Sequence, residues 1–300
     1  MKKNKAIGII IISLIYLFTL GCGVGIYFLF PEVLRNQSLL MLLIIDLLAT
    51  IIIYIFSCIF KNASIYDPYW SVFPPIGYIA FSLMTGYFNP YVLIFIILVS
   101  LWSVRLTINW AMNFKNLSIQ DWRYQGFKDK HPKTFFLINF FGIHLFPTIM
   151  VFIGMLPGFN FMEKAISIQL KGTTVISFVV ILFAIIIEMI ADIQMYSFRK
   201  KNTVPGAIMN KGLWKYSRHP NYFGEIVFWA GIWLTYFSAE PDHIIGFLMC
   251  ACPIVIFVLF QFVSIPMLEK RQLKNKSGYK EYMENTNALL IVPLFDKKKK

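Results

Sequence analysis

Residues 212–237 read GLWKYSRHPNYFGEIVFWAGIWLTYF and join two unlike kinds of sequence. The first part carries Arg218, His219, Asn221 and Glu225 within eight residues, whereas the second part is almost entirely apolar. The apolar run predicts a membrane helix, because the bilayer core excludes polar surface. Ionisable side chains are costly there, so their position at the start of this helix predicts a functional role.

The composition of the whole chain is that of an integral membrane protein. Of its 300 residues, 58% are hydrophobic and 14% are charged, and the mean hydropathy is +0.65. A span of a bilayer core about 30 Å thick needs roughly 20 apolar residues. Such windows fall at residues 6–30, 38–60, 72–88, 90–112, 135–157, 173–197, 222–238 and 243–266. The sequence therefore predicts an all-α, polytopic membrane helix bundle of about eight spans.

The chain has a net charge of +13, and the distribution of its positive charges predicts how the chain is oriented in the membrane. With both termini in the cytoplasm, all 28 Lys and Arg residues except Arg35, Arg105, Lys164 and Lys171 fall on the cytoplasmic side, as the positive-inside rule predicts. We therefore expect a multi-pass protein of a bacterial inner membrane, or of the endoplasmic reticulum in a eukaryote, with membrane lipids around it. Nucleic acid is not an expected partner. The Cys and His residues show no ligand spacing, so no metal site is expected.

Three polar segments share the predicted cytoplasmic side, namely residues 67–71, 120–124 and 212–225. Within the spans, Glu188 and Asp192 stand four residues apart and so share a helix face. Gln194 and Arg199 follow them, and Arg105 and Glu225 complete the set. These groups either neutralise one another between helices or line a polar cavity open to water. Taken together they favour the cavity, whereas the lone Asp46 is interpreted as structural.

The segment 212–225 has the residue types that suit a phosphate-bearing ligand. Trp214, Tyr216 and Tyr222 offer stacking faces, and Arg218, with Lys215, offers positive charge beside a helix start. The alternative is an interfacial belt of aromatic and basic residues. Such a belt does not require His219, Asn221 or Glu225.

At these residues the chain resembles the C-terminal domain of the steroid 5α-reductase family, in its branch of short multi-span proteins. The string Arg218-His219-Pro220-Asn221-Tyr222-Phe223-Gly224-Glu225 carries the resemblance, together with residues 266–271, Tyr279, Tyr282 and residues 291–293. It covers roughly residues 60–296. It implies N-terminal spans over residues 1–60 and a membrane catalytic domain over residues 61–300. The wider superfamily includes sterol reductases and isoprenylcysteine carboxyl methyltransferases.

The reductase members imply NADPH held between membrane helices and hydride delivery to a polarised carbon–carbon double bond. On this resemblance Asn221, Glu225, Asp192 and Arg199 would hold the cofactor, and Arg218 would meet its phosphate. The residues near Glu269 and Arg271 would close the pocket. With the neighbours identified above, the candidate cofactor-binding residues are Asp192, Gln194, Arg199, Trp214, Tyr216, Arg218, His219, Asn221, Tyr222, Glu225, Glu269 and Arg271.

An enone reductase also needs a proton donor on the substrate carbonyl. Asp67 resembles the family's catalytic Glu, but Trp102 stands where the family has a Tyr, so Tyr69 and Tyr124 are the alternative donors. The expected function is an NADPH-dependent oxidoreductase acting on a lipid-like substrate such as a steroid, sterol or isoprenoid. The alternatives are an S-adenosylmethionine-dependent methyltransferase of a lipidated substrate and a non-enzymatic membrane protein. The sequence does not define the oligomeric state.

Overall fold

The computed structural model describes residues 2–166, 172–202, 204–240 and 242–293, and these residues are almost entirely helical. They contain no strand, and the one isolated bridge joins Ser217 to Asn287. The structure thus confirms the predicted all-α class. The chain divides into two compact units, Met1–Ser167 and Ile168–Lys300, which we describe separately. The family resemblance predicts a division of the chain at residue 60. That division concerns function, and the two compact units do not test it.

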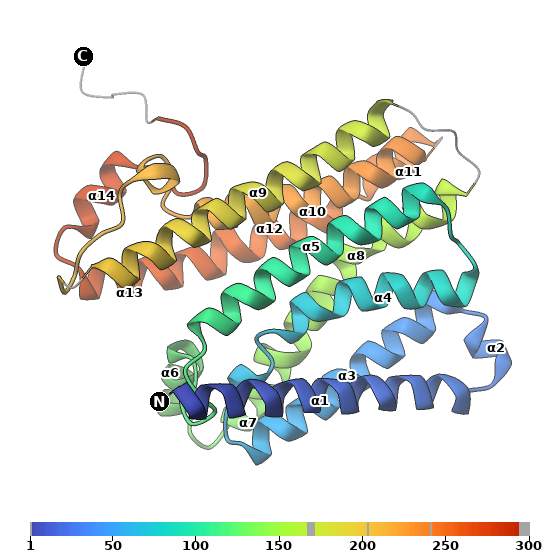
Figure 1. The fold of residues 1–300 in the computed structure, drawn as a ribbon, viewed down its shortest axis with the longest axis horizontal. Helices are drawn as coiled ribbons and strands as arrows, with labels where there is room; N and C mark the ends of the chain where they lie inside the picture. Colours follow the sequence, from blue (N-terminus) through green and yellow to red (C-terminus); the bar gives the residue numbers. More distant parts are fainter. Residues whose placement is uncertain (1, 167–171, 203, 241, 294–300) are drawn as a thin grey trace. The chain divides into compact units, whose positions relative to one another are not determined.

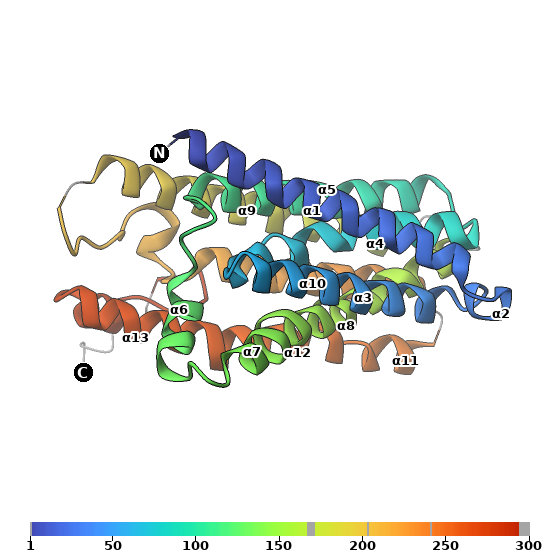
Figure 2. The same cartoon turned by 90° about the horizontal axis from the view of Figure 1, so that it is seen from below.

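The N-terminal unit is a bundle in which α1 and α3 run side by side (Figures 1 and 2). Short turns and the π-helical segment Ile138–Leu145, which leads directly into α8, connect its longer helices. Its α-helices are α1 (Lys2–Leu29), α2 (Glu32–Arg35), α3 (Ser38–Ile59), α4 (Tyr69–Thr85), α5 (Pro90–Asn113), α6 (Trp122–Lys130), α7 (Phe135–Leu137) and α8 (Phe146–Ala165).

The C-terminal unit is built on a long antiparallel pair, α9 and α10, and on a second long helical stretch that ends near residue 275 (Figure 1). A 3₁₀ turn at Gly212–Lys215 precedes α10, and a π-helical segment at Phe260–Ser264 joins α12 to α13. Its α-helices are α9 (Gly172–Lys201), α10 (Pro220–Ala239), α11 (His243–Leu248), α12 (Ala251–Leu259), α13 (Ile265–Asn275) and α14 (Tyr279–Asn285).

Six helical segments of the described residues are long and apolar enough to cross a membrane. They are Asn4–Leu29, Ser38–Ile59, Pro90–Asn113, Phe135–Ala165, Gly172–Lys201 and His243–Asn275. The predicted spans at 72–88 and 222–238 also fold as helices, α4 and α10, but do not belong to this set. Lys297–Lys300, which contribute to the predicted charge asymmetry, lie outside the described residues. The cytoplasmic placement of both termini stays a prediction.

Several buried polar side chains of the N-terminal unit are paired with one another. The Tyr69 hydroxyl donates to Asp46 Oδ1 at 2.6 Å. Thr148 Oγ1 lies 2.8 Å from the Tyr66 hydroxyl and 2.9 Å from Thr50 Oγ1. A bilayer core offers no water for such groups, so internal pairing is what permits their burial.

Two glycines let α9 and α10 pack closely. A Cβ atom at Gly224 would lie 2.3 Å from Glu188 Cγ and 3.1 Å from the Ala184 carbonyl oxygen, and one at Gly231 would lie 2.6 Å from Ile181 Cγ1. Small residues bring membrane helices together in this way. Gly224 therefore fixes where the beginning of α10 lies along α9.

Gly224→Ala is expected to lower the thermal midpoint of unfolding, because the added methyl group must displace Glu188 or separate the helices. Overpacking of this kind costs about 1–3 kcal/mol. Gly25→Ala is the matched control, since a Cβ there meets nothing within 4 Å and the residue also lies in a membrane helix. Thermal unfolding of both variants in one detergent measures the difference. Equal midpoints would contradict the packing role of Gly224.

Candidate functional site

Two of the polar segments predicted to face the cytoplasm meet in the N-terminal unit. Asn62 Nδ2 donates to the Leu117 carbonyl at 2.7 Å, and the Ala63 amide donates to Gln120 Oε1 at 2.9 Å. The Asp121 amide donates to Ser64 Oγ at 2.8 Å. The loop after α3 is thus bound to the start of α6.

This docking places Asp67 beside Tyr124, whose hydroxyl donates to Asp67 Oδ1 at 2.7 Å. Arg123 lies over the Tyr124 ring at 5.4 Å and binds Asp121 at 2.8 Å. Burial raises the pKa of Asp67 from 3.8 to about 6, and the nearby Arg123 charge and the Tyr124 hydrogen bond hold it from rising further. Burial and the Asp67 charge raise the pKa of Tyr124 well above its usual value. A carboxyl group that titrates near neutrality is suited to proton transfer.

Tyr69, the other candidate donor, is bound elsewhere. Its hydroxyl donates to Asp46 within the helical bundle, and its ring packs against Tyr66 at 5.6 Å between centroids. Trp102, which the sequence resemblance compares with a catalytic Tyr, is fully buried and meets the Trp70 ring edge-on at 5.9 Å. The structure therefore joins Asp67 with Tyr124 and places Tyr69 in a second polar pair.

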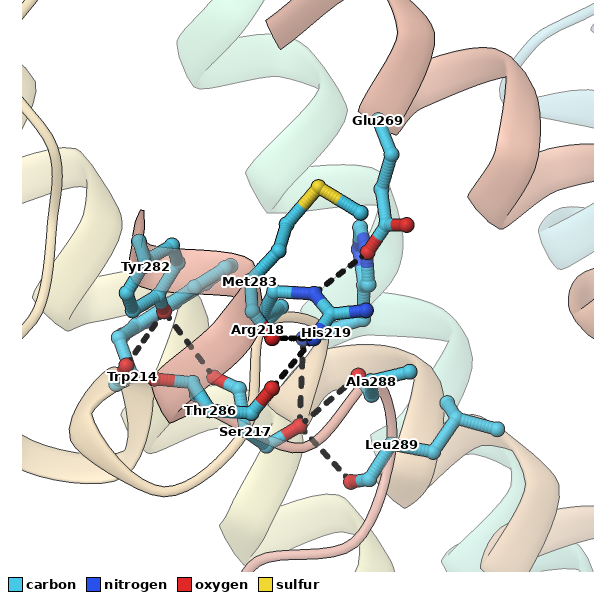
Figure 3. A network of polar contacts seen from close by, with 10 residues as sticks. All are labelled: Trp214, Ser217, Arg218, His219, Glu269, Tyr282, Met283, Thr286, Ala288 and Leu289. Carbon is cyan, nitrogen blue, oxygen red and sulfur yellow. Dashed lines mark hydrogen bonds and ion pairs between the residues drawn. The ribbon is translucent and has the colours of Figure 1, made fainter. Parts of the chain in front are cut away.

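In the C-terminal unit, Arg218 is held by the end of the chain (Figure 3). Its Nε donates to Glu269 Oε1 at 2.6 Å, and its Nη1 donates to the carbonyl oxygens of Met283 and Thr286. His219 Nε2 lies 3.2 Å from the same Glu269 oxygen. This arrangement gives Arg218 a structural role that the sequence did not predict. Binding of a phosphate by Arg218 would have to share the guanidinium with these groups and stays a prediction.

The residues flanking Arg218 extend this connection. The Arg218 amide donates to the Asn287 carbonyl at 2.8 Å, and the His219 amide donates to the Ala288 carbonyl at 3.1 Å. Ser217 Oγ donates to the Leu289 carbonyl at 2.8 Å (Figure 3). Residues 286–289 thus lie along the segment that leads into α10.

The remaining candidates on α9 and before α10 have mixed roles. Gln194 Oε1 accepts the Leu213 amide at 3.0 Å, and Trp214 Nε1 donates to the Ala191 carbonyl at 3.1 Å, so both fix the 3₁₀ turn against α9. Tyr216 is exposed, with the Lys215 ammonium 5.7 Å from its ring centroid.

At the start of α10, Tyr222 packs between His219 and Phe260, with ring centroids 5.6 and 4.6 Å away. Glu225 is buried and accepts the Trp229 indole N–H at 2.9 Å. Asn221 is half-buried in the first turn, and no hydrogen bond joins its side chain to the rest of the described structure. Its amide is thus available to a ligand.

Three cations gather where α9 ends and α13 ends. Arg199 lies close enough to interact electrostatically with Asp192, Arg271 and Lys276. Burial and the Arg199 charge lower the pKa of Lys276. Two of the three cations, Arg199 and Arg271, were expected from the sequence. Lys276 was missed, and only its place in the basic run after residue 269 could have suggested it.

No group of three or more His, Cys, Asp or Glu side chains capable of holding a metal ion occurs in the parts of the chain that the structure describes.

The fold and these clusters define a polytopic helical membrane protein with polar sites in both units. Residues 53–286 match the family described as "Protein of unknown function (DUF1295)", and the chain belongs to that family. An uncharacterized protein of Schizosaccharomyces pombe is 25% identical over 197 residues, which are 58% of this chain and 57% of the yeast protein. The match thus spans little more than half of the yeast relative. No solved structure matches the chain.

Asp67→Asn is expected to change how stability depends on pH. The folded protein holds the Asp67 proton up to pH about 6, whereas the unfolded chain releases it near 3.8. Folding is therefore favoured most at low pH, and stability from this group falls as pH rises from about 4 to about 6. The thermal midpoint of the wild type should decline over that range relative to Asp67→Asn. Asp129→Asn, an exposed carboxyl on α6, is the control. Parallel curves for all three proteins would contradict the pKa shift.

Glu269→Gln is expected to loosen residues 279–289, because it removes the negative charge that faces Arg218 and His219. Breaking a buried ion pair costs on the order of 3 kcal/mol. Hydrogen–deuterium exchange should rise in residues 279–289, whereas Glu281→Gln, an exposed acid on α14, should leave it unchanged. Unaltered exchange in Glu269→Gln would show that the ion pair does not hold the C-terminal segment.

Proposed function

We propose that this protein is a membrane-embedded reductase that uses NADPH to reduce an activated carbon–carbon double bond in a lipid-like substrate. The observation that carries the proposal is the gathering of Arg199, Arg271 and Lys276 beside Asp192 at one end of the C-terminal unit. The steroid 5α-reductase resemblance in residues 218–225 supports the same conclusion.

Cations that lie close together repel one another, and here three of them lie near the acid Asp192. The lowered pKa of Lys276 is a direct consequence of burial and of the neighbouring Arg199 charge. A ligand with several phosphate oxygens relieves this repulsion and accepts charge-assisted hydrogen bonds from the guanidinium groups. S-Adenosylmethionine has no phosphate and carries a sulfonium cation. The cluster therefore favours a nucleotide with phosphates over the methyl donor.

The donor set fits NADPH. Arg199, Arg271 and Lys276 would bind phosphate oxygens, the exposed Tyr216 ring offers a stacking face, and the Asn221 side-chain amide is available for a polar group. When bound, this cofactor supplies hydride. Arg218 and Glu269 would act indirectly, since their ion pair holds the segment before α10 in place.

Within the N-terminal unit, Asp67 and Tyr124 are the candidate groups for proton transfer. Reduction of a double bond conjugated to a carbonyl places negative charge on the carbonyl oxygen, which a nearby acid must stabilise or protonate. Asp67 and Tyr124 form a carboxyl–phenol pair. The Tyr124 hydroxyl donates its proton to Asp67 Oδ1, and the two oxygen atoms lie 2.7 Å apart. We propose that Tyr124 presents this proton and that Asp67, with its pKa near 6, replaces it. Asp67→Asn should then slow turnover and leave NADPH affinity unchanged.

The nucleotide preference can be measured without knowing the substrate. NADPH at about 100 times its Kd should stabilise the detergent-purified protein by roughly 2.7 kcal/mol, and S-adenosylmethionine should not. Arg199→Gln, Arg271→Gln and Lys276→Gln should each weaken NADPH binding about tenfold, the equivalent of 1.4 kcal/mol. Lys270→Gln, which removes an adjacent exposed charge, is the matched control.

Two results would overturn the proposal. Stabilisation by S-adenosylmethionine alone would identify the methyltransferase alternative. Equal NADPH affinity in Lys270→Gln and in the three cluster variants would show that the cations do not bind the nucleotide.

A further inference from the structure

A cavity of about 280 Å³ lies between α1, α3 and α4 in the N-terminal unit. Its walls are apolar along most of its length and include Leu42, Ile45, Phe73 and Ile76. The lining residues of α1 run from Tyr16 to Phe28, about 18 Å at roughly 1.5 Å rise per residue. The volume is at the lower end for small-molecule pockets, of roughly 300–1,000 Å³. The cavity is therefore long and small, the shape of a single apolar chain.

One side of the cavity is continuous with the surface of membrane helices. Val24 and Phe28 of α1 are 52% and 68% exposed, and Leu83 of α4 is 81% exposed, yet all three line the cavity. Apolar side chains that are exposed on membrane-spanning helices face lipid. A ligand can thus enter from the bilayer without crossing water.

Two tyrosines, Tyr16 and Tyr69, are among the residues that line the cavity. The Tyr69 hydroxyl donates to Asp46 Oδ1 at 2.6 Å, and the Tyr16 hydroxyl donates to the Ile65 carbonyl at 2.7 Å. The two rings meet edge-on, with centroids 6.0 Å apart. Since both hydroxyl protons are already donated, each oxygen has only lone pairs to offer a ligand. A ligand that reaches either tyrosine oxygen must therefore donate the hydrogen bond.

We propose that this cavity binds a single-chain lipid alcohol, with its hydrocarbon chain between α1 and α4 and its hydroxyl group donating to Tyr69. The inference goes beyond the proposed reductase function and does not depend on it, because binding requires no cofactor. An intramembrane carboxyl group is costly and is a functional candidate for that reason. Asp46 is the positioning residue of the site, since it fixes the direction of the Tyr69 hydroxyl.

The test uses the full-length protein in phosphatidylcholine nanodiscs and a long-chain fatty alcohol bearing a diazirine. Irradiation followed by mass spectrometry maps the labelled residues, and unlabelled compounds compete. Hexadecanol should suppress labelling of cavity residues at a concentration at least tenfold lower than its methyl ether or hexadecane. The ether can accept a hydrogen bond but cannot donate one. Labelling suppressed equally by all three compounds, or by none, would show ordinary surface lipid and overturn the proposal.

Ala80→Phe places a ring in the cavity and should abolish competed labelling. Ile79→Phe adds a ring at the next residue of α4, which is 44% exposed and does not line the cavity, and should leave labelling intact. Equal labelling in the two variants would overturn the proposal. If Ala80→Phe fails to fold, Ala49→Leu fills the same cavity from α3.

The role of Asp46 predicts a change in selectivity that a purely structural residue would not cause. Asp46→Asn keeps an oxygen that accepts the Tyr69 proton, so the preference for the alcohol over the ether should remain. Asp46→Leu frees the Tyr69 proton for either ligand, so the ether should bind as well as the alcohol. Tyr69→Phe should also abolish the preference. Retention of the tenfold preference in Asp46→Leu would remove the positioning role. NADPH stabilisation, measured in parallel, reports on the reductase proposal separately.

Discussion

A polar group inside a bilayer must find its partner within the chain, and this constraint orders both units. The cost of an unsatisfied polar group in a medium without water is several kcal/mol, larger than most packing differences between neighbouring helices. In the N-terminal unit the constraint pairs Tyr69 with Asp46 and Thr148 with Tyr66. In the C-terminal unit it pairs Glu225 with Trp229 along α10. The first pair joins α4 to α3, whereas the last lies within α10.

The same constraint gives Arg218 a structural role. Arg218 is bound by Glu269 and by backbone carbonyls of the last helix, so it holds the chain end against the start of α10. Arg199 interacts electrostatically with Arg271, Lys276 and Asp192. An excess of positive charge in one place is electrostatically costly and is relieved by an anionic ligand. The proposed nucleotide site rests on this local excess of positive charge.

The two aspartate–tyrosine pairs of the N-terminal unit also differ in their surroundings. Asp67 lies in the loop before α4 and Tyr124 in the short helix α6, both outside the six candidate spans, where Arg123 and Asp121 tune the carboxyl group. Asp46 and Tyr69 lie between apolar helices beside a lipid-sized cavity. The sequence offered Tyr69 and Tyr124 as alternative donors, both in segments predicted to face the cytoplasm. Their partners lie 23 and 57 residues away, so no local pattern could distinguish the two.

The sequence by itself determined the all-α membrane class, the approximate positions of the long helices and the segments in which polar residues concentrate. These properties depend on local composition and on spacing within one helix, both of which can be read from neighbouring residues. Only the tertiary structure decided that Arg218 is bound to residues 269–286, that Lys276 joins Arg199, and that Asp46 holds Tyr69. Those pairings join residues distant along the chain. Their physical cause is the cost of burying a polar group without a partner, and which partner is within reach is a property of the packed fold rather than of any segment.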